Sequence, residues 1–191
     1  MRHSWAGLLV LALAGCGTVP DKDSAAVEAA KRCRKAAEQG DAAAQWQLGA
    51  CYTFGQGVPQ DHAEAVRCFR QAAEQGHVKA QYCLAVAYDV GRGVPQDKPQ
   101  AATWFRKAAE QGNPQAQHSL GQCYRLGEGV GKDPVRAYYW SSRSTSGEGE
   151  PLDPSYLPGY ERASFFIKRL LKPDQIEQAE GWLRDKTPPS P

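Results

Sequence analysis

Small and apolar residues recur in the middle of the chain with the spacing of an amphipathic helix. In each stretch they fall at positions i, i+4, i+7 and i+8, which places them on one face of a helix. The stripe occurs three times, 36 residues apart: Ala44, Leu48, Cys51 and Tyr52; Ala80, Leu84, Ala87 and Tyr88; Ala116, Leu120, Cys123 and Tyr124. Recurrence at a constant interval predicts stacked copies of one structural unit.

Each of these helices is followed by a Gly-x-Gly-Val motif, at residues 55–58, 91–94 and 127–130. A phosphate-binding loop also uses closely spaced glycines, but it follows a β-strand and has a longer glycine pattern. Here a helix precedes the motif, and the motif occurs three times. We therefore interpret the glycines as helix-ending residues in the left-handed conformation.

A second helix is predicted after each motif. An aspartate stands at each expected N-cap, and Glu64 completes a D-x-x-E capping box with Asp61 in the first unit. The other caps are Asp97 and Asp133. The residues expected to be buried are Ala65, Phe69 and Ala72, then Ala101, Phe105 and Ala108, with glycines ending successive second helices at Gly40, Gly76 and Gly112. One αα-hairpin cannot bury its apolar face alone, so stacked copies should share a continuous core.

The pattern predicts an all-α protein, a solenoid of antiparallel helix pairs. The predicted segments are a signal peptide (1–15), a tether (16–25), the repeats (26–145), an irregular loop (146–158), closing helices (159–186) and a disordered tail (187–191). Within the repeats, a half unit (26–43) precedes full units at 44–79, 80–115 and 116–145.

The N-terminal segment predicts export. Basic Arg2 precedes an apolar run at residues 5–14, which is too short to cross a bilayer and fits the hydrophobic region of a secretory signal. The run ends in Leu-Ala-Gly-Cys, which resembles a bacterial lipobox. This resemblance implies a diacylglycerol on Cys16 and attachment to a membrane; an ordinary signal peptide with an incidental cysteine is the alternative. Gly17 and Thr18 follow Cys16, with no aspartate beside it, which favours the outer membrane if the cell is Gram-negative.

Net charge, motifs and residue spacing argue against nucleic-acid binding, metal and catalytic sites. The formal net charge is +2 with both signs interspersed, so no nucleic-acid partner is predicted. No CxxC, HExxH, GxSxG or S-x-x-K motif occurs, and the histidines do not have the spacing of a metal site, so we predict no metal, cofactor or catalytic residue. Cys68 and Cys83 fall on adjacent helices at similar distances from Gly76, a placement that allows a disulfide.

The repeated pattern A-x-x-x-L-G-x-x-Y-x-x-G-x-G-V-x-x-D, followed by "AAEQG", resembles the Sel-1-like repeat, a relative of the tetratricopeptide repeat. The resemblance covers residues 26–144. It implies a right-handed α-solenoid whose concave surface binds peptides or protein segments. A cysteine-rich subgroup is associated with penicillin binding or hydrolysis, but its cysteine pair corresponds to Ala73 and Gln81 here.

The outward side of each first helix should line the concave groove. Read across the units, it carries an aromatic row, Trp46, Tyr82 and His118, and a polar row, Thr53, Asp89 and Arg125. The aromatic residues would supply contact area for a partner if they are exposed. Alternatively, they pack between adjacent units.

These observations favour a lipid-anchored envelope scaffold that binds a protein or peptide partner in signalling or complex assembly. A penicillin-binding or β-lactamase-like cell-wall protein is the alternative, and a purely tethering role is a third hypothesis.

Overall fold

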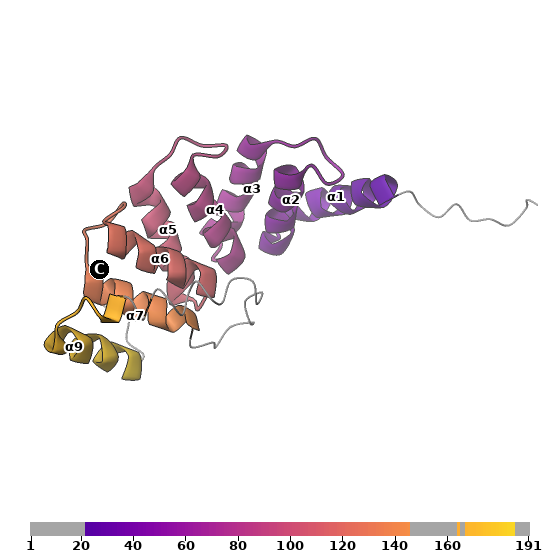
Figure 1. Ribbon diagram of the computed structural model, residues 1–191. Coiled ribbons are helices and arrows are strands. Elements are labelled where there is room, and N and C mark those ends of the chain that lie inside the picture. The colour runs from indigo at the N-terminus through magenta and orange to yellow at the C-terminus, as the bar shows by residue number, and fades with distance from the viewer. Residues whose placement is uncertain (1–21, 146–163, 165–166, 186–191) are drawn as a thin grey trace, which may run out of the picture.

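Eight α-helices and no β-strand make up the part of the chain that the computed structural model describes, residues 22–145, 164 and 167–185. They are α1 (Lys22–Glu38), α2 (Ala42–Phe54), α3 (His62–Glu74), α4 (Val78–Val90), α5 (Lys98–Glu110), α6 (Pro114–Leu126), α7 (Pro134–Thr145) and α9 (Pro173–Arg184). The helices follow one curved path (Figure 1). The predicted all-α solenoid is confirmed. The predicted signal peptide, irregular loop and tail lie outside the described residues.

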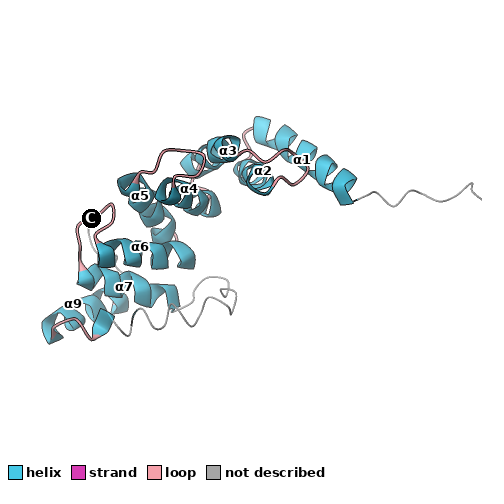
Figure 2. Cartoon of the chain, turned by 45° about the horizontal axis from the view of Figure 1, so that its top comes forward, coloured by secondary structure: helices cyan, strands magenta, loops and turns pink. Residues whose placement is uncertain are grey.

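Successive helices form the pairs α2–α3, α4–α5 and α6–α7, and α1 stands alone as the half unit. It begins at Lys22, inside the segment predicted to be a tether. Each helix from α1 to α7 packs against the next, and α9 packs against α7. Figures 1 and 2 place α2 and α4 on the inner side of the curve and α3 and α5 on the outer side.

Side-chain caps begin the helices of the repeats, mostly as predicted. Asp61 accepts hydrogen bonds from the backbone N–H groups of Ala63 and Glu64, and Asp97 and Asp133 cap α5 and α7 in the same way. The capping box predicted for Glu64 is wrong. The N–H of Asp61 donates to the carbonyl of Tyr52 at 3.0 Å instead, and the Glu64 carboxylate accepts from Arg67.

The glycine motifs end helices, as interpreted. Gly55, Gly91 and Gly127 have positive φ angles and close α2, α4 and α6. The second glycine of each motif has a further role. A Cβ on Gly93 would overlap the backbone carbonyl of His62 in the preceding unit, and Gly57 and Gly129 meet the carbonyls of Ala26 and Lys98 in the same way. These glycines therefore let one unit's loop rest on the backbone of the unit before it.

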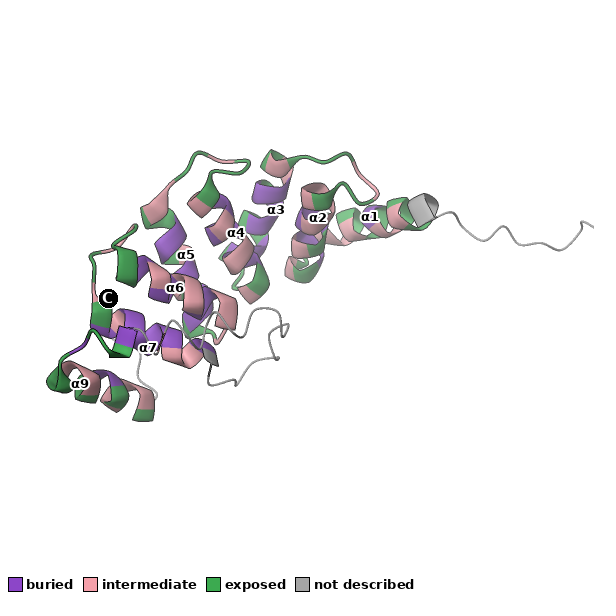
Figure 3. Cartoon of the chain, in the orientation of Figure 1, coloured by how far each residue is buried: buried purple, intermediate pink, exposed green. Residues whose placement is uncertain are grey.

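The core runs along the faces where neighbouring helices meet (Figure 3). Leu84 and Leu120 are fully buried, and the predicted Phe69 and Phe105 are buried beside them. At the C-terminal end, Trp140 and Tyr139 are the largest buried side chains, and the Trp182 ring of α9 meets Tyr139 edge-on at 6.1 Å. Helix α9 thereby covers apolar surface that the last unit would otherwise expose.

Hydrogen bonds between polar side chains also link the units. The buried Gln81 donates from Nε2 to the carbonyl of Ala73 in the unit before and accepts from Gln111 of its own unit. In the same way, Gln45 donates to the carbonyl of Ala37 and accepts from Gln75. Arginine–tyrosine hydrogen bonds recur at the same interval, from Arg34 to Tyr52, Arg70 to Tyr88 and Arg106 to Tyr124. These bonds satisfy polar groups that stacking removes from water.

Candidate functional site

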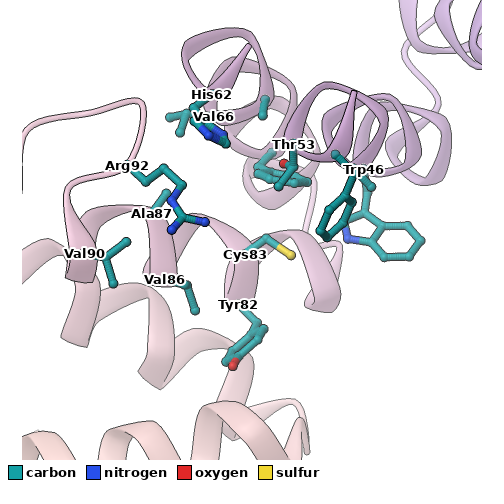
Figure 4. Close-up of a pocket in the computed structure, with 14 residues that line it drawn as sticks. Trp46, Thr53, His62, Val66, Tyr82, Cys83, Val86, Ala87, Val90 and Arg92 are labelled. Carbon is teal, nitrogen blue, oxygen red and sulfur yellow. The ribbon is translucent and has the colours of Figure 1, made fainter. Parts of the chain in front are cut away.

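A cavity of about 280 Å³ opens between α2, α3 and α4 on the inner side of the solenoid (Figure 4). Its walls are overwhelmingly apolar. The lining residues are Trp46, Ala50, Thr53 and Phe54 of α2; His62, Ala65, Val66 and Phe69 of α3; Tyr82, Cys83, Val86, Ala87 and Val90 of α4; and Arg92 of the following loop. A pocket of this kind, concave and apolar with a few polar groups, is the usual form of a binding site.

A glycine of α2 shapes the floor of this cavity. A Cβ at Gly49 would lie 2.6 Å from Cε1 of Phe69, so the glycine lets the Phe69 ring lie closer to α2 than a side chain at this position would. The corresponding residue of the next unit is Ala85, which is fully buried.

Two of the three residues of the predicted aromatic row line the cavity. Trp46 and Tyr82 both line the cavity and are half-buried, and they also pack between units. The Trp46 ring stacks on His77 at 5.5 Å, with Lys79 Nζ 5.6 Å from its centroid. Tyr82 lies 6.0 Å from the ring of Phe105. Because neither ring is fully buried, Trp46 and Tyr82 stay candidates for contact with a partner.

His118, the third member of that row, lies on α6 and does not line the cavity. Burial lowers its pKa to about 4, with a smaller contribution from the positive charge of Arg125. The imidazole is consequently neutral at physiological pH. His77 has a structural task, because its Nδ1 accepts from the N–H of Ala80 and caps α4.

The polar row is largely committed to contacts within the chain. Thr53 lines the cavity, but its hydroxyl donates to the carbonyl of Gly49 at 2.9 Å. Asp89 and Arg125 lie outside it. Lys98 Nζ donates to Asp89 at 2.8 Å and to Glu128 at 3.0 Å, and the Arg125 guanidinium donates to Gln122 at 2.6 Å. The two acidic contacts raise the pKa of Lys98.

Sequence reasoning missed an exposed apolar position that recurs in every unit. Phe54, Val90 and Leu126 are the last helical residues of α2, α4 and α6, and their exposed fractions are 70%, 55% and 50%. We call these three residues the apolar rim; Phe54 and Val90 also line the cavity. The available signal was an apolar residue directly before each Gly-x-Gly-Val motif, outside the buried stripe.

Arg92 was missed as well, because it lies between the two glycines of a motif that we interpreted as purely structural. Figure 4 shows its side chain extending from the loop after α4 toward the cavity, above Ala87. None of the residues that line the cavity is acidic.

The disulfide considered between Cys68 and Cys83 is not formed, because both are free thiols. The Cys83 thiol lines the cavity and points toward Trp46 (Figure 4). Cys68 is buried outside the cavity. The positive charges of Arg67 and of Arg34 in α1 lower the pKa of its thiol, but by less than burial raises it. Burial raises the pKa of both thiols, so neither is activated as a nucleophile.

Among the described residues, no cluster of histidine, cysteine or acidic side chains has the arrangement of a metal site. Within the same segments, no helix is long and apolar enough to cross a membrane.

The stacked helix pairs and their inner cavity define an α-solenoid, a class of protein that presents an extended surface to its partners. The Sel1 repeat profile matches residues 33–41, 42–77, 78–113 and 114–147. The chain therefore belongs to the Sel1 repeat family. Proteins of this family typically mediate protein–protein interactions, and the scaffold is generally non-enzymatic.

Solved structures agree with this assignment. A Sel1 repeat protein from Oxalobacter formigenes is 34% identical over 70% of this chain and 95% of its own, with a TM-score of 0.60. A protective antigen of uropathogenic Escherichia coli with an SLR fold is 39% identical over 79% of this chain, with a TM-score of 0.69; this chain spans 31% of it. Helicobacter pylori cysteine rich protein B, 20% identical over 71% of this chain and 96% of its own (TM-score 0.53), shares the fold. No curated protein matches the chain.

Proposed function

We propose that this protein is an envelope scaffold that holds a protein or peptide partner on the inner surface of its solenoid and is anchored to a membrane through a lipid on Cys16. The apolar cavity between α2 and α4 carries this proposal. Phe54 and Val90 of the apolar rim line it, and the rim side chains are exposed at equivalent positions of three successive units. Exposed apolar residues gathered on one surface are typical of interaction sites.

The β-lactam alternative has less support. Reaction with a β-lactam requires an activated nucleophile. The Thr53 hydroxyl in the cavity donates to a carbonyl of its own helix, and burial raises the pKa of the Cys83 thiol.

Photocrosslinking in intact cells tests the binding surface. With p-benzoylphenylalanine in place of Ala50 in the cavity, we expect an adduct with one partner protein. The pair Phe54→Ser and Val90→Ser should abolish most of this adduct, because it removes exposed apolar contact area while leaving the buried core intact. The readout is the adduct on an immunoblot, followed by mass spectrometry.

The control variant is Leu170→Ser, which removes an exposed apolar side chain (79%) away from the cavity and should leave the adduct unchanged. A second control places the photocrosslinker at the exposed Arg67 of α3, outside the cavity. An equal adduct from Arg67, or one that survives loss of the rim, would move the binding surface elsewhere.

Lipid attachment is tested at Cys16. Metabolic labelling with an alkyne fatty acid should label the native protein and place it in the membrane fraction, whereas Cys16→Ala should be unlabelled because the acceptor thiol is gone. Release of an unlabelled native protein into the soluble fraction would refute the anchor without affecting the proposed binding surface.

A further inference from the structure

Positive charge is present at the cavity, where Arg92 is the only charged side chain among the lining residues. Arg92 extends toward it from the loop after α4, and Lys79 lies against the face of Trp46 at its other end. His62 contributes an imidazole to the wall, and no lining residue is acidic. The site therefore offers positive charge beside an apolar surface.

Nearby carboxylates are engaged elsewhere. Asp89 is held by Lys98, and Glu64 by Arg67 at 2.7 Å. Across residues 22–145, 164 and 167–185, the Arg92 guanidinium makes no ion pair and no side-chain hydrogen bond. A guanidinium has five N–H donors arranged to bind a carboxylate in bidentate fashion, so Arg92 remains available to an incoming acidic group.

The apolar part of the cavity suits a bulky side chain. An apolar cavity of about 150 Å³ in another protein is large enough to bind benzene. The cavity here is about 280 Å³, and the side chains of Val66, Phe69 and Val86 line it. One large aliphatic or aromatic side chain can enter while its backbone stays in the open groove.

We propose that the cavity binds an acidic–apolar segment of the partner protein, in which a bulky apolar side chain fills the pocket and an adjacent aspartate or glutamate binds Arg92. This inference rests on the proposed function and specifies the chemistry of its partner. The apolar rim continues past the cavity to Leu126, so an extended segment would meet a further apolar contact at the next unit.

The test is a titration of the isotopically labelled full chain, followed by NMR at the Trp46 indole and the Arg92 side chain. The probes are acetyl-Gly-Asp-Phe-Glu-Gly-amide, its uncharged analogue acetyl-Gly-Asn-Phe-Gln-Gly-amide, and acetyl-Gly-Asp-Ser-Glu-Gly-amide, which lacks the bulky side chain. Sodium decanoate is the fourth probe, because a fatty acid also combines an apolar group with a carboxylate.

We expect the acidic phenylalanine peptide to shift both resonances and to bind roughly three to five times more tightly than its uncharged analogue at low salt, as one ion pair allows. Arg92→Gln should remove that difference. Arg184→Gln, which changes an exposed arginine on α9 outside the cavity, should preserve it. The serine peptide should bind more weakly than either phenylalanine peptide.

Equal affinity for the charged and uncharged peptides, or a preference that survives Arg92→Gln, would overturn the proposed carboxylate contact. If decanoate binds as tightly as the acidic peptide, the inferred ligand is a fatty acid and not a segment of a partner protein. If the photocrosslink still depends on Phe54 and Val90 in these cases, protein binding stands and only the ligand chemistry fails. Loss of that dependence would instead remove the proposed function itself.

Discussion

Replacing Gly93 by alanine lowers the free energy of unfolding by about 2 to 5 kcal/mol. The residue has a φ of +74°, where an L-amino acid is strained by about 1 to 2 kcal/mol. In addition, the new methyl group would overlap the carbonyl of His62 in the preceding unit, and relieving such overpacking typically costs a further 1 to 3 kcal/mol, roughly. Urea unfolding followed by circular dichroism measures the loss.

Gly76→Ala is the matched control. Gly76 has a φ of +87°, but no atom lies within 4 Å of where its Cβ would stand. This variant should show only the backbone strain, about 1 to 2 kcal/mol. If Gly93→Ala is no more destabilising than Gly76→Ala, the close contact between this loop and the backbone of the preceding unit does not constrain position 93.

Truncation of Leu84 to alanine is the second large effect, about 3 kcal/mol of lost stability. Leu84 lies on α4 in the middle of the row and is fully buried, so the change removes transfer free energy and leaves a cavity that stacked helices on both sides cannot fill. Chemical denaturation again provides the measurement.

Val90→Ala on the same helix is the control, because this side chain is 55% exposed. It should change stability by less than about 0.5 kcal/mol. Similar losses for the two variants would contradict the arrangement in which α4 turns its Leu84 face inward and its Val90 end toward solvent.

Local signals in the sequence accounted for most of the helix ends. An aspartate that caps and a glycine that closes act within one turn of the chain, so their roles follow from the residues alone. Where the prediction for Glu64 was wrong, the competing partner came from another helix. The carbonyl of Tyr52 in α2 takes the N–H of Asp61 that Glu64 was expected to bind.

The candidate site was predicted only in part. Trp46, Thr53 and Tyr82 were expected in the groove and do line the cavity, because their position follows from the helical period. Asp89 and Arg125 have the same period but lie outside the cavity. Arg92 lies in a loop and the apolar rim lies at the ends of helices, and at such positions the helical period does not predict which way a side chain points.

The repeat itself, its helices and its stacking were determined by the sequence, because apolar spacing, caps and glycines act over a few residues and recur three times. Only the tertiary structure decided which helix faces are left uncovered by neighbouring helices. The cavity exists because α2, α3 and α4 approach one another around Gly49 and Phe69, and Cys68 and Cys83 face different neighbours for the same reason. Contacts between residues of separate helices depend on how the helices are rotated and spaced, which no short stretch of the chain specifies by itself.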